Sequence, residues 1–127
     1  MNHNMPGVYV VSDSIGETAE MVVRAAASQF NSGKIEIKRI PYVTDEESIV
    51  EIIGQAAEEH AIIAYTLVIE ELAQFLRSKA QEASVLAVDL LGPMMEALRL
   101  ASNVEPKREP GLVRKVDEIY FRRVEAI

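Results

Sequence analysis

The 127-residue sequence contains no cysteine and two histidines, His3 and His60. Without cysteine the chain has no disulfide framework, no thiolate nucleophile and no cysteine-ligated metal, which is typical of a protein in a reducing cytoplasm. Two histidines are too few for a metal centre built from imidazole ligands. We therefore expect a cytoplasmic protein with no metal site and no resident cofactor in this chain.

Long apolar runs and an excess of positive charge are also missing. Charged residues interrupt every hydrophobic stretch well before the ~18 residues that a membrane span needs. Residues 1–7 lack the basic and apolar regions of a secretory signal. Twenty acidic residues against thirteen basic ones give a net charge of -7, which repels phosphate backbones and anionic lipids. We expect a flexible arm over residues 1–7, and neither nucleic acid nor a membrane as a partner.

Hydrophobic residues make up 49% of the sequence and charged residues 26%, which is the balance of a soluble domain with one core. Strand-like runs alternate with segments whose apolar residues recur at helical spacing. The strands are predicted over residues 8–12, 34–43, 61–67 and 85–90. Four strand–helix units predict an α/β domain over residues 8–102, with an open, mostly parallel sheet of about four strands covered by helices, Rossmann-like or flavodoxin-like.

Apolar stripes in the helical segments predict which side faces the core. The stripes are Val22, Val23, Ala26 and Phe30 in the first helix, Ile49, Ile52, Ile53 and Ala56 in the second, and Ile69, Leu72, Ala73, Leu76 and Ala80 in the third. Thr44 with Glu47 predicts a capping box before the second helix, and His60 is expected at its C-terminus. Gly92 and Pro93 open a fourth helix. Its apolar side, expected in the core, contains Met94, Met95, Leu98 and Ala101.

The character of the sequence changes at residue 103. Pro106, Pro110 and Gly111 indicate a linker, and six of the thirteen basic residues lie at Lys107 or later. A final helix is predicted from the spacing of Val113, Val116, Tyr120, Val124 and Ile127. This helix has no capping residue at its end, so it either leads into a further domain or docks on the sheet and finishes there.

The residues between the first strand and the first helix are the leading candidates for a phosphate or substrate site: Ser12, Asp13, Ser14, Gly16 and Thr18. In open parallel sheets ligands bind beyond the carboxyl ends of the strands, and a helix N-terminus offers free N–H groups. Hydroxyl groups and a glycine suit a phosphate, whereas Asp13 and Glu17 oppose it unless a cation or donor group intervenes. The alternative is that the serine and aspartate side chains only cap the helix and that Gly16 relieves the turn.

Thr66 and Asp89 are predicted at the ends of the third and fourth strands, on the same rim as Asp13. Two carboxylates on this rim would suit a magnesium ion bound together with a substrate phosphate. In the simpler interpretation, Asp89 caps the turn at Gly92-Pro93 and Thr66 is a buried strand end.

Two familiar kinds of phosphate chemistry are not supported by the sequence. A P-loop needs glycine, four residues, and then Gly-Lys-Ser/Thr. Here Gly33-Lys34 is preceded by Ser28 at the required place and followed by Ile35. A receiver-type phosphoacceptor is also poorly supported, because the third strand ends in Thr66 rather than in a carboxylate.

Three separated segments resemble the bacterial pyruvate, phosphate dikinase regulatory protein family. They are VYVVSDSIGETAE at residues 8–20, VDLLGPMM at 88–95 and PGLVRKVDEIYFRRVEAI at 110–127. The resemblance implies a bifunctional serine/threonine-protein kinase that phosphorylates a threonine of the dikinase with ADP. The same enzyme removes that phosphate by phosphorolysis with inorganic phosphate, which releases pyrophosphate. The family's P-loop lies downstream of the third segment, so residues 103–127 are expected to lead towards a C-terminal P-loop domain that holds the catalytic residues.

The resemblance also implies roles for this half of the enzyme. Alone it is expected to be inactive, with ADP and inorganic phosphate as substrates of the full-length protein and the dikinase as its partner. A link to the downstream domain or to the dikinase is expected from four basic residues: Arg114, Lys115, Arg122 and Arg123. The alternatives are a regulator of phosphoenolpyruvate synthetase, a flavodoxin-like module that binds a phosphate or nucleotide without catalysis, and a docking domain without a ligand. The oligomeric state stays open, a homo-oligomer included.

Overall fold

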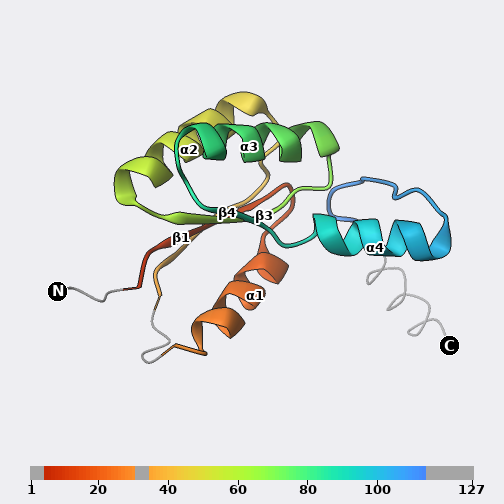
Figure 1. Ribbon diagram of the computed structural model, residues 1–127, viewed down its shortest axis with the longest axis horizontal. Coiled ribbons are helices and arrows are strands. Elements are labelled where there is room, and N and C mark those ends of the chain that lie inside the picture. Colours follow the sequence, from red (N-terminus) through yellow and green to blue (C-terminus); the bar gives the residue numbers. More distant parts are fainter. Residues whose placement is uncertain (1–4, 31–34, 114–127) are drawn as a thin grey trace, which may run out of the picture.

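The computed structural model describes residues 5–30 and 35–113, and it contains four strands that alternate with four helices (Figure 1). The strands are β1 (Val8–Ser12), β2 (Ile37–Ile40), β3 (Ile62–Thr66) and β4 (Ala87–Asp89). The helices are α1 (Glu17–Ala27), α2 (Glu46–Glu59), α3 (Glu70–Glu82) and α4 (Gly92–Ser102). Every described strand pair is parallel, which confirms the predicted α/β fold.

The strand order is β2-β1-β3-β4. This is the flavodoxin-like order, because β1 lies next to β3, whereas a Rossmann-like sheet would place β2 between β1 and β3. After β1 the chain forms β2 on one edge of β1, and it then crosses over to form β3 on the opposite edge of β1. The sheet therefore has its switch point between the carboxyl ends of β1 and β3, where ligands bind in folds of this class.

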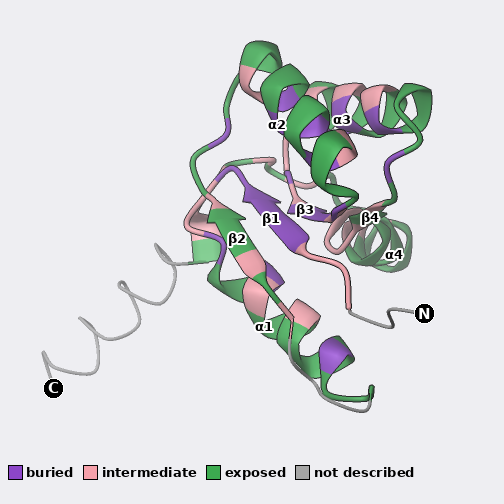
Figure 2. Ribbon diagram, turned by 90° about the vertical axis from the view of Figure 1, so that its left-hand side faces the viewer, coloured by how far each residue is buried: buried purple, intermediate pink, exposed green. Residues whose placement is uncertain are grey.

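Helices cover both faces of the sheet. In Figure 1, α2 and α3 lie above the sheet and α1 lies below it. The central strand β1 is buried along its whole length (Figure 2), as expected for a parallel strand covered on both faces. Its side chains alternate, so that Tyr9 and Val11 pack in the core under α2 and α3, while Val8 and Val10 pack with Ala19 of α1.

The apolar stripes predicted to face the core are buried in α2 and mostly buried in α3, but not in α1. All four stripe residues of α2 are buried, as are Ala73, Leu76 and Ala80 of α3. In α1 the buried residues are instead Ala19 and Ala27, and Phe30, which lies beyond the helix, is 58% exposed. The prediction for α1 was therefore wrong except at Val23, which packs against the core on this side of the sheet. The reason is that α1 packs small alanines closely against the sheet, and spacing of large residues does not reveal such a contact.

The N-terminus of α2 is capped by Asp45. The carboxylate oxygen Oδ1 of Asp45 accepts a hydrogen bond of 2.7 Å from the backbone N–H of Ser48. Asp45 has extended backbone angles, which is the usual conformation at this position. The predicted capping box was wrong by one residue, because Asp45 rather than Thr44 ends the extended segment and begins the helix.

Replacing Asp45 by alanine is expected to lower the free energy of unfolding by about 1 kcal/mol. The substitution removes the acceptor for the Ser48 N–H group and a negative charge at the positive end of the helix dipole. Urea unfolding followed by circular dichroism measures the effect, and Thr44→Ala is the matched control. A loss for Thr44→Ala as large as that for Asp45→Ala would contradict the assignment of the cap.

The helix α4 lies beside the sheet rather than over either face (Figure 1). It begins at Gly92 with Pro93 in its first turn, as predicted. However, none of its residues is buried, and Met94 and Leu98 are 58% and 57% exposed. The prediction that Met94, Leu98 and Ala101 face the core was therefore wrong. Within the described ranges, no helix combines the length and apolar character needed to cross a membrane.

Candidate functional site

The loop between β1 and α1 is held in place by backbone hydrogen bonds to two neighbouring segments. The N–H groups of Tyr42 and Val43 donate to the carbonyl oxygens of Ser14 and Ser12, both at 2.9 Å. On the other side, the N–H group of Asp13 donates to the carbonyl oxygen of Thr66 at 3.4 Å. The loop therefore continues the sheet at its carboxyl edge, in a fixed position at the switch point.

The N-terminus of α1 has no side-chain cap among the described residues. Gly16 occupies the cap position with a left-handed φ of 87° and, as a glycine, has no side chain that could accept a hydrogen bond there. Ser12 does not fill this role, because its Oγ accepts a hydrogen bond from the N–H group of Ser14 within the loop itself. Neither Ser12 nor Asp13 therefore caps α1, whereas Gly16 relieves the turn before the helix, as in the alternative interpretation. The first N–H groups of the helix carry the partial positive charge that favours an anion.

A cavity of about 270 Å³ opens at this loop. It brings together most of the predicted site residues, namely Ser12, Asp13, Ser14, Gly16, Thr18 and Thr66. Val68 and Leu91 also line the cavity, and residues 109 and 111–113 form a further wall. The cavity thus lies between the carboxyl ends of β1 and β3, as the topology of the sheet requires.

The hydroxyl groups of Ser14 and Thr18 are available to a ligand. Neither makes a hydrogen bond within the described part of the chain, although the backbone of Ser14 is bonded on both sides. Ser12 is only 3% exposed, and its hydroxyl oxygen is already used by the loop. The two hydroxyls that remain are therefore the best donors for oxygen atoms of a ligand in this cavity.

Asp13 is buried and joins the β1 loop to the segment after β3. Its Oδ2 atom accepts a hydrogen bond of 2.8 Å from the N–H group of Val68. Burial raises the pKa of the Asp13 carboxyl above its ordinary value of 3.8, and hydrogen bonds from backbone N–H groups oppose this shift in part. Burial of the Asp13 carboxylate therefore costs solvation free energy. The group nevertheless links two segments and also lines the cavity.

The substitution Asp13→Asn is expected to make the folded chain more stable at pH 7, because asparagine keeps an acceptor for the Val68 N–H group without a buried charge. The raised pKa means that the folded state binds a proton more tightly than the unfolded state. Below pH 3.8 the protonated Asp13 carboxyl makes its full contribution to the free energy of unfolding. This contribution falls as the pH rises from 3.8 through the higher pKa of the folded state. The stability gain of the variant should grow over the same range. Urea unfolding between pH 3 and pH 7 tests this, and a constant difference would contradict it.

The charged residues in the described lining of the cavity are all acidic. Asp13, Glu17 and Glu109 line it, and none of its described lining residues is lysine or arginine. Arg39 approaches the loop near Gly16, but its guanidinium forms an ion pair of 3.0 Å with Glu20. A phosphate in this cavity would need positive charge from outside the described lining.

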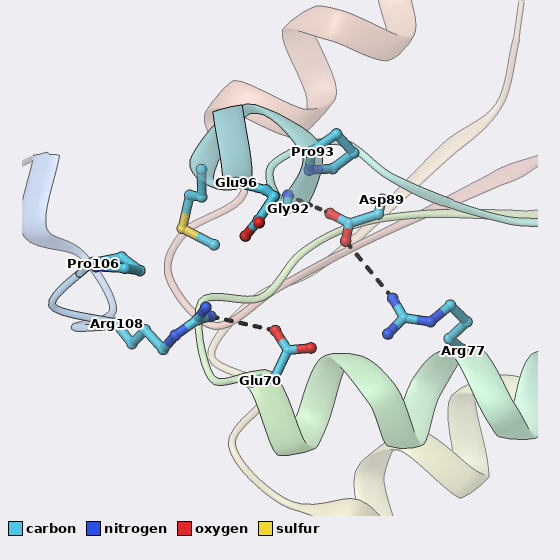
Figure 3. A pocket seen from close by; sticks show the side chains of 9 residues that line it. Glu70, Arg77, Asp89, Gly92, Pro93, Glu96, Pro106 and Arg108 are labelled. Carbon is cyan, nitrogen blue, oxygen red and sulfur yellow. Dashed lines mark hydrogen bonds and ion pairs between the residues drawn. The ribbon is translucent and has the colours of Figure 1, made fainter. Parts of the chain in front are cut away.

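Asp89 lies in a neighbouring pocket of about 250 Å³, shown in Figure 3, and not in the loop cavity. Its Oδ1 atom accepts hydrogen bonds from the N–H groups of Leu91, at 3.0 Å, and Gly92, at 2.7 Å. Its Oδ2 atom lies 3.9 Å from the Arg77 guanidinium. Asp89 therefore fixes the turn that begins α4, as in the simpler interpretation of the sequence. Among the described residues, no three histidine, aspartate or glutamate side chains are grouped to hold a metal ion.

Val68 and Arg108 link the β1 loop to the segment after α4, and neither was predicted from the sequence. Arg108 donates a hydrogen bond of 3.1 Å to the carbonyl oxygen of Val68. It also donates one of 3.3 Å to Glu70 (Figure 3). The backbone of Val68 thus binds Asp13 on one side and Arg108 on the other. Val68 lies two residues after the end of β3, so its place at the ligand edge could have been inferred from the sheet rule. Arg108 carries no comparable signal, because its contact depends on how the segment after α4 folds back.

Four predicted contact residues lie outside the described part of the chain: Arg114, Lys115, Arg122 and Arg123. Their role as a link to another domain or to a partner stays a prediction.

Comparisons with known proteins agree with the resemblance found in the sequence. The family model described as Kinase/pyrophosphorylase matches residues 8–127. A protein of Syntrophomonas wolfei named pyruvate, phosphate dikinase regulatory protein 2 is 62% identical over 127 residues, which are 100% of this chain and 46% of that protein. Proteins of Halalkalibacterium halodurans and Carboxydothermus hydrogenoformans, each named pyruvate, phosphate dikinase regulatory protein, are 55% and 47% identical. The aligned parts are 96% and 97% of this chain, and 45% and 44% of those proteins.

The chain spans about half the length of the curated relatives it matches. The family match extends from the first strand to the last residue. It therefore includes the candidate loop and residues 109 and 111–113, which form a wall of the cavity. On this match the chain belongs to the kinase/pyrophosphorylase family.

Proposed function

We propose that this chain is the α/β part of a bifunctional regulator of pyruvate, phosphate dikinase. As a serine/threonine-protein kinase, the regulator transfers the β-phosphoryl group of ADP to a threonine of the dikinase and leaves AMP. In the opposite direction, inorganic phosphate attacks the phosphothreonine, so that pyrophosphate forms and the threonine hydroxyl is restored. The observation that carries the proposal is the kinase/pyrophosphorylase match over residues 8–127. The names of the relatives favour the dikinase over phosphoenolpyruvate synthetase as the target.

The loop cavity is proposed to hold a phosphate-bearing substrate of this reaction. Support comes from the free hydroxyls of Ser14 and Thr18, the uncapped N-terminus of α1, and the position of the cavity at the switch point of the sheet. Phosphoryl transfer depends mainly on positioning and on neutralisation of the phosphate charge. Because the described lining is acidic, the cationic groups and the phosphate-binding loop are proposed to come from the rest of the full-length regulator.

The test uses a chimera in which these 127 residues replace the matched part of the Syntrophomonas wolfei relative. The chimera is incubated with purified dikinase and ADP, and mass spectrometry follows the mass added to the dikinase and its position. Inorganic phosphate is then added, and pyrophosphate release is measured. The expected result is phosphorylation on one threonine and its reversal by phosphate, with no reaction by the 127-residue chain alone.

Two controls make the result specific. Phosphoenolpyruvate synthetase replaces the dikinase as acceptor, and ATP replaces ADP as donor. Modification of the synthetase but not of the dikinase would overturn the choice of target. A folded chimera that modifies neither acceptor would overturn the proposed function of this chain as part of such a regulator.

A further inference from the structure

The strongest feature outside the candidate site is the exposed apolar side of α4. Its members are Met94, Ala97, Leu98 and Ala101, which are spaced so that they share one side of the helix. All four are exposed, including the large side chains of Met94 and Leu98. We call this side the α4 face. An amphipathic helix in a folded domain normally buries such a stripe, so the α4 face lacks the contact that its sequence pattern predicts.

Exposed apolar residues are concentrated in the segment of the chain that contains β4 and α4. Six of the twelve exposed large hydrophobic residues of the described chain lie between residues 86 and 104: Leu86, Val88, Met94, Leu98, Leu100 and Val104. Scattered single apolar residues on a surface need no explanation, whereas concentration in one region marks an interaction surface. The region consists of β4, α4 and the residues next to them.

The strand β4 is an open edge of the described sheet. It is the last strand in the order β2-β1-β3-β4 of the described sheet. Val88 pairs in register with Ala64, which packs in the core on the side of α1, yet Val88 is 48% exposed. The helix α1 thus covers the centre of this sheet face but leaves β4 uncovered. Open edge strands with exposed apolar side chains are usually covered by another segment.

The two charged residues of α4 lie on the opposite side of the helix from the α4 face and are paired with each other. Arg99 binds Glu96 through two hydrogen bonds, of 2.6 and 3.0 Å, and lies 3.6 Å from Glu105. The α4 face itself therefore carries no charged side chain that an ionic partner could recognise. The surface therefore fits an apolar partner that packs against it, rather than a nucleic acid or a strongly charged peptide.

The length of the relatives indicates which partner this is. In the Syntrophomonas wolfei relative, the part similar to this chain is 46% of the protein, so the larger part of that protein must pack somewhere. Both faces of the central strands are already covered here by α1, α2 and α3. Among the described residues, the segment of β4 and α4 holds half of the exposed large hydrophobic residues. We propose that the α4 face is the contact surface for the part of the full-length regulator that lies outside these 127 residues.

The oxidation of two methionines tests the proposal directly. Met94 lies on the α4 face, and Met21 of α1 is 71% exposed and serves as the matched control. The 127-residue chain and the chimera with the Syntrophomonas wolfei relative are treated with hydrogen peroxide, and mass spectrometry follows each methionine. We expect Met94 to oxidise several-fold more slowly in the chimera than in the chain, and Met21 to oxidise equally in both. Equal oxidation of Met94 in both proteins would overturn the proposal.

Paired substitutions give a second measurement. Met94→Gln with Leu98→Gln should leave the melting temperature of the 127-residue chain almost unchanged, because both residues are exposed. In the chimera the same pair should lower it by several degrees, whereas Met21→Gln with Val22→Gln should have little effect in either protein. Protection of Met94 in the chain alone that disappears on dilution would identify a second copy as the partner and overturn the proposal. A protected Met94 in a folded but inactive chimera would support this contact while the proposed function fails.

Discussion

Replacement of both Ser14 and Thr18 by alanine in the chimera is expected to raise the KM for inorganic phosphate, for ADP or for both by at least about tenfold, with the melting temperature unchanged. A hydrogen bond to a charged group contributes about 1.5–3 kcal/mol, and 1.4 kcal/mol corresponds to a factor of ten. Both hydroxyls lack a partner within the described chain. Their removal therefore breaks no hydrogen bond of the described residues and is expected to change the free energy of unfolding by less than about 0.5 kcal/mol.

The measurement compares kinase and phosphorylase rates over a range of ADP and phosphate concentrations. Ser78→Ala is the matched control, because Ser78 is exposed on α3, away from the cavity. Single variants separate the two hydroxyls and indicate whether one of them binds the phosphate that attacks in the reverse reaction. Unchanged KM and kcat for both substrates in the double variant would remove the loop from the proposed substrate site. The cavity at the carboxyl ends of β1 and β3 would then bind neither ADP nor inorganic phosphate.

The fold was predictable where burial follows a simple period. Large β-branched residues in α2 and the continuous apolar run of β1 must be buried together, so the elements and their type followed from the sequence. The strand order did not, because it depends on which crossover packs on which face. Most of the buried side of α1 was missed, because its buried residues are Ala19 and Ala27 and such small side chains give little hydrophobic signal in a sequence.

The candidate site was predictable in its local part. The residues Ser12, Asp13, Ser14, Gly16 and Thr18 form one loop, and Thr66 joins them because β3 is the neighbour of β1. Asp89 was expected on the same rim, but β4 lies one strand further away, and the Asp89 carboxylate is used by the turn before α4. The link from Arg108 through Val68 to Asp13 spans residues far apart in the chain. Such a link cannot be read from spacing along a single element.

Gly16 is the position at which one added side chain tests the geometry of the whole site. Its φ of 87° is a conformation that favours glycine. A Cβ atom at this position would lie 3.0 Å from Cγ of Arg39 and 3.3 Å from its Cδ. Relief of this contact would move the Arg39 side chain, whose guanidinium pairs with Glu20.

The substitution Gly16→Val is therefore expected to lower the free energy of unfolding by about 1–3 kcal/mol and to weaken phosphate use by the chimera. Gly54→Ala is the contrasting control, because Gly54 lies within α2 and a methyl group added there would meet no atom within 4 Å. That substitution should stabilise the chain by about 0.5–1 kcal/mol. Urea unfolding measures both effects. If Gly16→Val were as harmless as Gly54→Ala, the left-handed turn before α1 would be wrong, and the uncapped helix N-terminus could not support a phosphate site.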